Sequence, residues 1–263
     1  MRLAADRPVK IVLLGAGGTG GYVIPHLYRI AFASNRPCRV IIADGDIVER
    51  KNLIRQNFAE CDIGENKAAV MAERYAEVFG IETEYIPEYI EDEQCLYDML
   101  HVSGSYVQPK PIGILIGAVD NNRSRVMCNA VFNRLDDIIY IDSGNSEFTG
   151  QVVCGAKMGG KVLSKPIARV YPDILTDTEK FPSELSCTER SVSAPQTITA
   201  NLFASTAVAA MLYYLLIDGK LENTRIAFSS RKLSMRKIGT VKYRMKTAIK
   251  WTQEPCRTIA RSE

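Results

Sequence analysis

Residues 9–20 read VKIVLLGAGGTG, a short run of aliphatic and β-branched residues that ends in a cluster of glycines. The run predicts a buried strand, and residues 21–33, GYVIPHLYRIAFA, predict the helix that follows it. Gly15, Gly17 and Gly20 therefore lie between a strand and a helix, where bare glycines and the helix N-terminus accommodate phosphates. The GK[ST] ending of a P-loop is missing. This stretch predicts a nucleotide-binding, Rossmann-like fold, with NAD, FAD and ATP all left open.

Strands and helices continue to alternate along the chain as far as residue 142. The predicted strands are 38–44, 82–86, 112–119 and 137–142, and the predicted helices are 66–79, 92–101 and 122–135. Such alternation predicts right-handed crossovers and an α/β fold with a mostly parallel sheet and helices on both faces. Residues 151–164 and the segment from 225 onward predict further strands of mixed or antiparallel direction. We expect one domain over 1–263, with a nucleotide-binding half (8–142) and a half (143–263) that carries the partner and cysteine-loop functions.

The composition is that of an ordinary soluble globular protein. The 263 residues are 46% hydrophobic and 24% charged, and the net charge of +3 disfavours a protein built to coat nucleic acid. The seven cysteines contain no CxxC pair, which predicts neither a disulfide framework nor a structural zinc site. The apolar run after Lys10 is too short for a secretory leader. We therefore expect a cytoplasmic protein.

Two segments of the C-terminal half are unusual in charge or polarity. Residues 225–263 hold 11 basic and two acidic residues, a net charge of +9. Such a tail suits an acidic partner, a nucleic acid or a membrane surface, but its spacing favours a solvated strand pair with outward basic side chains. The apolar run 202–217, LFASTAVAAMLYYLLI, is 16 residues long, whereas a membrane span needs about 20. A helix buried on all sides, or in a dimer interface, is favoured over a membrane helix.

The loop after the second strand, DGDIVERKNLIRQNF at 44–58, separates the nucleotide classes. Its polar residues are Asp44, Asp46, Asn52, Arg55 and Gln56, with Lys67 at the start of the next helix. A triphosphate that is about to lose pyrophosphate develops charge that Arg and Lys stabilise, and a lone carboxylate such as Asp120 is a natural magnesium ligand beside it. Arg55 and Lys67 would alternatively be surface charges, and Asp120 a helix cap. An NAD-dependent oxidoreductase would use the glycines and Asp44 but leave the other loop residues without a role.

Several motifs in register with the glycine cluster resemble one family. They are GAGGTG at 15–20, D-x-D-x-V-x(3)-NL-x-RQ at 44–56, Lys67, DN-x(3)-R at 120–125, SGNSEFTGQV at 143–152 and SCTERSVSAP at 186–195. On these motifs the chain, from about Val9 to at least Ile217, resembles the ThiF/MoeB/HesA superfamily, the adenylating fold shared with ubiquitin-activating enzymes. The NL-x-RQ run is the most specific of them, since GxGxxG alone is common.

The resemblance implies an ATP-dependent adenylyltransferase that activates the C-terminal carboxylate of a small ubiquitin-like (β-grasp) protein or of a peptide. It implies that the glycines Gly15, Gly17, Gly18 and Gly20 pack against the phosphates, and that Asp44 and Asp46 hold the ribose. It further implies that Asn52, Arg55 and Lys67 contact phosphates, that Gln56 supports their loop, that Asp120 binds Mg²⁺, and that Asn121 and Arg125 line the site.

Cys187 lies in the polar segment FPSELSCTER beside Arg190, where a nearby cation favours thiolate, and it falls at the family's cysteine position. The resemblance implies that Cys187 accepts the activated acyl group or takes part in sulfur transfer, although some members only adenylate, and a free structural cysteine is the alternative.

The resemblance also implies a homodimer, and the short form of the chain is similar to the ThiF-family proteins of PRTRC gene systems. Two further alternatives stay open. One is a non-catalytic scaffold, and the other is a relative that modifies tRNA and grips RNA with its basic tail.

Overall fold

The computed structural model describes residues 1–101, 109–184 and 195–239. Within these residues a nine-stranded sheet has the order β3-β2-β1-β4-β5-β6-β8-β9, with β7 paired to β6. The strands from β3 to β5 in that order are parallel, and the pairs from β5–β6 onward are antiparallel. The bounds are β1 Val9–Leu14, β2 Cys38–Ala43, β3 Glu82–Ile86, β4 Ile112–Gly117, β5 Ile138–Asn145, β6 Thr149–Met158, β7 Lys161–Ser164, β8 Arg225–Ser229 and β9 Ser234–Lys237. The predicted fold class is confirmed.

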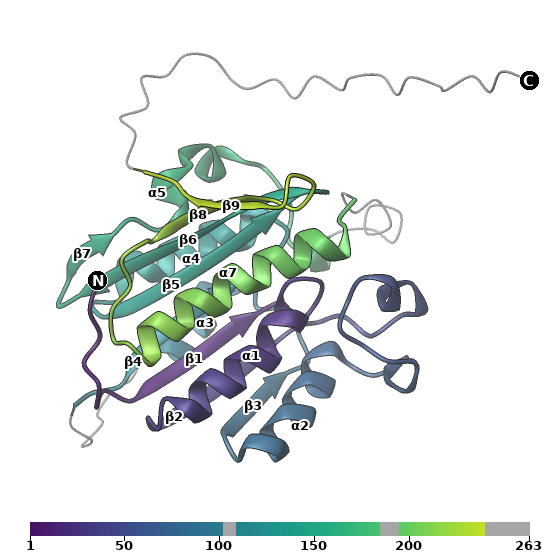
Figure 1. Cartoon of the computed structure of the whole chain (residues 1–263), viewed down its shortest axis with the longest axis horizontal. Coiled ribbons are helices and arrows are strands. Elements are labelled where there is room, and N and C mark those ends of the chain that lie inside the picture. The colour runs from purple at the N-terminus through teal and green to yellow at the C-terminus, as the bar shows by residue number, and fades with distance from the viewer. Residues whose placement is uncertain (102–108, 185–194, 240–263) are drawn as a thin grey trace, which may run out of the picture.

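Helices cover both faces of the sheet (Figure 1). One face carries α1 (Gly20–Ala33), α2 (Lys67–Phe79) and α7 (Ile198–Leu216), and the other carries α3 (Glu93–Leu100), α4 (Asn122–Arg134) and α5 (Ile167–Val170). Strand β1 is buried on both faces because Ile11 and Leu13 join the first core, whereas Val12 and Leu14 join the second. This burial explains why the central strands are continuous apolar runs without a polar alternation.

Of the two predictions for helix α7, burial on all sides or a place in a dimer interface, the first does not hold within the described residues. Its inner side packs beside α1 and against β5 and β6, whereas Ile198, Leu202, Tyr213 and Tyr214 are each at least 40% exposed. The helix is long and apolar enough to cross a membrane by length and composition, and half of that stretch is buried within the protein. The exposed apolar side is the part of α7 that the fold itself leaves uncovered.

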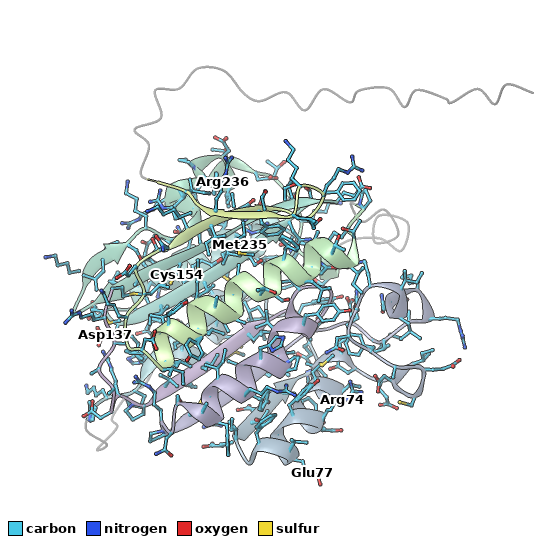
Figure 2. All side chains as sticks on the ribbon, in the orientation of Figure 1. Arg74, Glu77, Asp137, Cys154, Met235 and Arg236 are labelled. Atoms are coloured by element: carbon cyan, nitrogen blue, oxygen red, sulfur yellow. The ribbon has the colours of Figure 1, made fainter. Side chains whose placement is uncertain are left out.

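The remaining segments follow the sequence predictions in part. The expected loop over 165–197 instead contains α5 and two short 3-10 helices, η3 (Pro172–Thr176) and η4 (Pro182–Glu184), while 185–194, which includes Cys187, lies outside the described residues. Part of the expected basic strand pair is β8–β9, with Met235 and Arg236 on the outermost strand (Figure 2), and the rest of the basic segment, 240–263, lies outside the described residues. Two more 3-10 helices, η1 (Arg50–Ile54) and η2 (Glu60–Asp62), follow β2.

The strands β1, β2 and β4 end at the same edge of the sheet, because they are neighbours and parallel. The glycine cluster follows β1 at this edge and packs closely on itself and on the end of β4. A Cβ at Gly20 would lie 1.8 Å from the Gly15 carbonyl oxygen, and one at Gly15 would lie 2.7 Å from the Ala118 carbonyl oxygen. Gly15 also has φ +90°, a backbone conformation that residues with a Cβ rarely adopt. The turn from β1 into α1 therefore requires glycine at both positions.

We predict that Gly20→Ala lowers the free energy of unfolding by about 3 kcal/mol, because the new methyl group forces the Gly15 carbonyl out of place. Gly17→Ala is the matched control. Its Cβ would meet nothing closer than 3.7 Å, so the expected loss is below about 1 kcal/mol. Urea unfolding of both variants gives the comparison, and equal losses would contradict the close contact at Gly20.

Candidate functional site

The carboxylate of Asp44 holds together the two loops that follow β1 and β2. Its Oδ2 accepts a hydrogen bond from the Ala16 backbone N–H at 2.6 Å, and its Oδ1 accepts one from the Asp46 backbone N–H at 2.9 Å. Burial raises the pKa of Asp44 to about 6, against the opposing effect of the nearby Lys67 ammonium and the two backbone bonds. Both oxygens of Asp44 are thus engaged with the backbone beneath the glycine cluster.

Asp46 lies further toward the surface, with its side chain about half exposed. Its Oδ2 pairs with the Lys67 Nζ at 2.7 Å, and its Oδ1 accepts from the Tyr89 hydroxyl. The Lys67 side chain is only 5% exposed, so this ammonium is held in place at the first residue of α2. Asn66 caps the same helix: its Oδ1 accepts from Ala68 and Ala69, while its Nδ2 donates to the Asp44 and Asp46 carbonyls. Lys67 is therefore a buried residue of the site edge and not a surface charge.

The segment around η1 brings the side chains of Arg55 and Gln56 over the glycine cluster. The carboxamide of Gln56, a buried residue, lies 3.7–4.0 Å from the position that a Cβ on Gly17 would occupy. Within the described residues its Oε1 is buried without a hydrogen-bond partner, and such an oxygen costs free energy unless a donor completes it. Asn52 has a different position: it is buried, and its Oδ1 accepts from the Glu49 backbone N–H at 2.9 Å, which closes the η1 turn.

Arg55 reaches from this segment to the start of α7. Its Nη1 donates to the Gln196 Oε1 at 3.1 Å and to the Asn201 Oδ1 at 3.4 Å. The same Nη1 lies 2.6 Å from the position of a Cβ on Gly18, so the guanidinium rests directly on the glycine backbone. Arg55 and Gln56 thus cover adjacent glycines of the loop.

The loop after β4 contributes Asp120, Asn121 and Arg125. Asp120 is exposed beyond the end of the strand, and the cap of α4 is Asn121, whose Oδ1 accepts from the Ser124 N–H at 2.8 Å. Arg125 is buried and pairs with Asp142, its Nε lying 3.2 Å from Oδ1. The same guanidinium donates to the Val119 carbonyl at 2.7 Å, so it holds the loop that presents Asp120. Asp142 and Tyr140, joined at 2.7 Å, complete this buried cluster.

The described residues before 185–194 are fastened over the N-terminus of α4. The Asn122 side chain donates to Asp177 Oδ2 at 2.7 Å, and the Asn122 backbone N–H donates to Glu179. The bond from Asn122 lowers the pKa of Asp177. Ser183 bonds to Glu91 through its backbone N–H and its hydroxyl. The chain therefore runs across the edge of the sheet beside Asp120 as it approaches Cys187, which lies outside the described residues.

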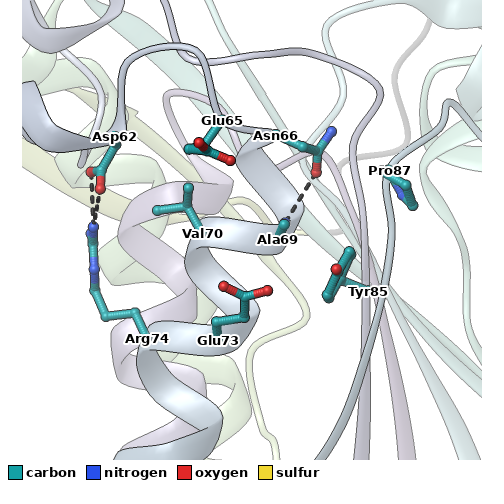
Figure 3. A pocket seen from close by; sticks show the side chains of 9 residues that line it. All are labelled: Asp62, Glu65, Asn66, Ala69, Val70, Glu73, Arg74, Tyr85 and Pro87. Carbon is teal, nitrogen blue, oxygen red and sulfur yellow. Dashed lines mark hydrogen bonds and ion pairs between the residues drawn. The ribbon is translucent and has the colours of Figure 1, made fainter.

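Two surface cavities lie away from the glycine cluster. One, of about 520 Å³, is formed by α2, β3 and the loop before α2, and contains the Asp62–Arg74 ion pair at 2.7 Å together with Glu65 and Glu73 (Figure 3). The other, of about 580 Å³, lies between α3 and the β2–β3 edge near Cys95. Within 1–101, 109–184 and 195–239, no group of three His, Cys, Asp or Glu side chains is arranged to hold a metal ion.

The structure adds residues that sequence reasoning did not single out. Asn201 and Gln196 lie beside the glycine loop, where Asn201 bonds to Thr19 of the loop itself, and Asp142 pairs with Arg125. Asn201 could have been singled out from the sequence, because it is an amide near the start of an uncharged and mostly apolar predicted helix. Asp142 is less conspicuous, as an acid in the apolar strand run 137–142. Their partners lie up to 182 residues away in sequence, so the pairings themselves were not visible.

We predict that the raised pKa of Asp44 makes the protein less stable as pH rises. A carboxyl with a higher pKa in the folded state adds stability below about pH 4 and loses it as pH rises through about 6. Relative to Asp44→Asn, which does not titrate, the free energy of unfolding of the wild type falls by about 3 kcal/mol between pH 4 and pH 7. Urea titrations at four pH values measure this difference. Parallel pH profiles for the two proteins would show that Lys67 and the two N–H donors outweigh burial.

Comparisons with known proteins match the family and the fold of this chain. The ThiF family model matches residues 5–248. PaaA is 16% identical with a TM-score of 0.61, over 88% of this chain and 63% of its own. E. coli MccB, solved with ATP, is 21% identical with a TM-score of 0.58, and the match covers 89% of this chain and 64% of the MccB chain.

MccB, described as a microcin C7 biosynthetic enzyme, was also solved with N-formylated MccA. That structure is 22% identical with a TM-score of 0.60, and the match covers 88% of this chain and 64% of the MccB chain. The chain thus spans somewhat less than two thirds of the length of these solved structures. No curated protein matches it by sequence. The family match over nearly the whole chain, together with the shared fold, shows that the chain belongs to the ThiF family.

Proposed function

We propose that this protein is an ATP-dependent adenylyltransferase, which activates the C-terminal carboxylate of a small ubiquitin-like (β-grasp) protein or of a peptide. The observation that carries the proposal is the arrangement of Arg55 over Gly18 and Gln56 over Gly17. Bare glycine backbone and an anchored cation fit a polyphosphate, and the Nε2 hydrogens of the Gln56 carboxamide are further donors beside them. A dinucleotide-binding dehydrogenase would leave both side chains without a role. The ThiF family and the ATP complex of the similar MccB support ATP as the nucleotide.

In the proposed reaction, a carboxylate oxygen attacks the α-phosphorus of ATP. The bond from that phosphorus to the oxygen bridging to the β-phosphate breaks, and pyrophosphate leaves with the bonding electron pair. The products are an acyl-adenylate and pyrophosphate. Negative charge grows on the leaving pyrophosphate, so cations held in place before the reaction stabilise the transition state most. Arg55 and Lys67 are the anchored cations of this site.

The contacts divide the proposed nucleotide-binding residues into two groups. We assign one group to direct contact with ATP: the backbone of the glycine cluster and the side chains of Asp46, Arg55, Gln56, Lys67 and Asp120. Asp44, Asn52, Asn121 and Arg125 act beneath them, because each is engaged in holding a loop or a helix start. For the ribose we favour Asp46 over Asp44, since the Asp46 side chain is about half exposed whereas Asp44 is buried beneath the glycine cluster.

Asp120 is the residue that would hold Mg²⁺. A magnesium ion bound with a nucleotide needs only one or two protein carboxylates, because phosphate and water oxygens complete its shell. Asp120 is exposed at the end of β4 next to the glycine cluster, and so fits that requirement. When bound, Mg²⁺ would neutralise phosphate charge; Arg125 keeps the loop with Asp120 in place through the Val119 carbonyl.

The first test is thermal unfolding with Mg·ATP, with NAD and with neither. Mg·ATP at 100 times its dissociation constant adds about 2.7 kcal/mol and raises the midpoint by a few degrees. We expect that shift with Mg·ATP, no shift with NAD, and a smaller Mg·ATP shift for Asp120→Ala.

Asp136→Ala is the control, because Asp136 is an exposed carboxylate just before β5, at the opposite edge of the sheet. Stabilisation by NAD alone would replace the proposal with an oxidoreductase. No stabilisation by either nucleotide would favour the scaffold.

We further propose a cytoplasmic homodimer that binds its carboxylate-bearing partner near the cysteine segment. The exposed apolar side of α7 supports the homodimer, since Ile198, Leu202, Tyr213 and Tyr214 leave a face that a second copy would bury. The five cysteines in the described ranges are free, which suits a reducing compartment. The MccB structure with N-formylated MccA supports a peptide as one class of partner.

We propose that Cys187 accepts the activated acyl group, on the basis of its position in the sequence motif. Cys187→Ala is then expected to abolish a thiol-sensitive conjugate with the partner while leaving ATP-dependent pyrophosphate exchange intact. Non-reducing electrophoresis of the reaction measures the conjugate. Cys95→Ala, which removes an exposed thiol on α3, is the control. A conjugate that persists in Cys187→Ala would exclude this residue as the acceptor.

A further inference from the structure

Helix α7 contains one buried amide that its packing does not require. Asn201 lies in the first turn of a helix without charged residues, and its side chain is completely buried. Burying an amide costs free energy unless hydrogen bonds compensate it, and an alanine at this position would favour the helix more and bury no polar group. The role of Asn201 must therefore come from its hydrogen-bond partners.

These partners converge on Arg55. The Asn201 Oδ1 accepts from the Arg55 Nη1 at 3.4 Å, and the Gln196 Oε1 accepts from the same Nη1 at 3.1 Å. The Asn201 Nδ2 donates to the Gln196 Oε1 at 3.2 Å and to the Thr19 Oγ1 at 3.4 Å. Arg55, Gln196 and Asn201 thus form a closed set of contacts, anchored to the glycine loop through Thr19.

The backbone of Gly18 is shaped to receive this set. A Cβ on Gly18 would lie 2.6 Å from the Arg55 Nη1 and 2.7 and 2.8 Å from the two Asn201 amide atoms. No rearrangement of one flexible tip would make room for it, because two side chains from different elements meet there. The glycine at position 18 is thereby explained by Arg55 and Asn201 together.

The partners of Arg55 are neutral. No ion pair joins Arg55 to a carboxylate within the described parts of the chain, whereas Lys67 and Arg125 are each paired with one. An amide oxygen fixes the direction of a guanidinium without cancelling its charge. A carboxylate in the same place would fix it but would offset part of the charge that the guanidinium offers to a phosphate, as Asp46 does for Lys67.

We propose that Asn201, together with Gln196, is a positioning residue that holds the Arg55 guanidinium over Gly18 with its charge uncompensated, ready for a phosphate of ATP. The inference rests on the proposed function, which supplies the phosphate. Asn201 does not itself contact the nucleotide in this scheme, so removing it acts only through Arg55.

A double-mutant cycle on the affinity for Mg·ATP tests this scheme. The dissociation constant is measured by calorimetry for the wild type, Arg55→Ala, Asn201→Ala and the double variant. A lost bond to a charged group weakens binding by about tenfold or more, so we expect each single variant to lose about tenfold. In the Arg55→Ala background, Asn201→Ala is expected to cause no further loss.

Controls separate positioning from damage to the helix. Ser205→Ala removes a buried hydroxyl one turn further along α7, which bonds only the Leu202 carbonyl, and should leave the affinity unchanged. If Asn201→Ala does not fold, Gln196→Ala supplies the same cycle from a half-buried position. Asn201→Asp keeps the size of the side chain but places a carboxylate beside Arg55, and should weaken binding as well.

The outcomes distinguish the two levels of the argument. A wild type that does not bind Mg·ATP overturns the proposed function and this inference with it. A wild type that binds, with losses that add in the double variant, overturns the positioning role alone. Undiminished affinity in Asn201→Asp overturns the argument from uncompensated charge. Non-additive losses with unchanged Ser205→Ala support the assignment.

Discussion

The absence of side chains in the turn from β1 to α1 is the constraint on which the rest of the site depends. The Gly15 carbonyl occupies the space of a Cβ at Gly20, the end of β4 occupies that of a Cβ at Gly15, and two polar side chains occupy that of a Cβ at Gly18. Three different elements thus approach one stretch of backbone closely. A single methyl group at any of these positions would separate elements that the sheet topology brings together.

Around this backbone, the buried charged residues differ from the more exposed ones in their hydrogen-bond partners. Asp44 and the Arg125–Asp142 pair are buried and satisfied by hydrogen bonds within the fold, where they fix the loops after β1, β2 and β4. Removing one member of a buried pair leaves an uncompensated buried charge and so lowers the free energy of unfolding strongly. Arg55 is instead held by neutral amides, and Asp120 is exposed. The buried carboxylates and Arg125 thus hold loops of the fold in place, whereas Arg55 is the cation that we propose is held for a phosphate.

Sequence periodicity predicted the elements of the parallel half closely, since its strands are buried on both faces and its helices are amphipathic. Prediction of the second half was less complete. The segment 165–197 was expected as a loop because Pro, Ser and Thr interrupt any period, yet α5 and two 3-10 helices form there. For helix α7 the sequence predicts a helix buried on all sides or in a dimer interface; it does not show which side is exposed, because a composition that is apolar all round has no directional signal.

The sequence by itself determined the class of fold, the family, and the short motifs whose residues converge at one edge of the sheet. It could do so because strand and helix periods are local, and because the NL-x-RQ run and the glycines keep a fixed spacing. Only the tertiary structure decided which of these residues are buried in contacts between loops and which are exposed at the edge of the sheet. Asp44 and Asp46 differ in role because of burial, and Asn201 meets Arg55 across 146 residues of chain. Such choices depend on packing between distant elements, which no local pattern records.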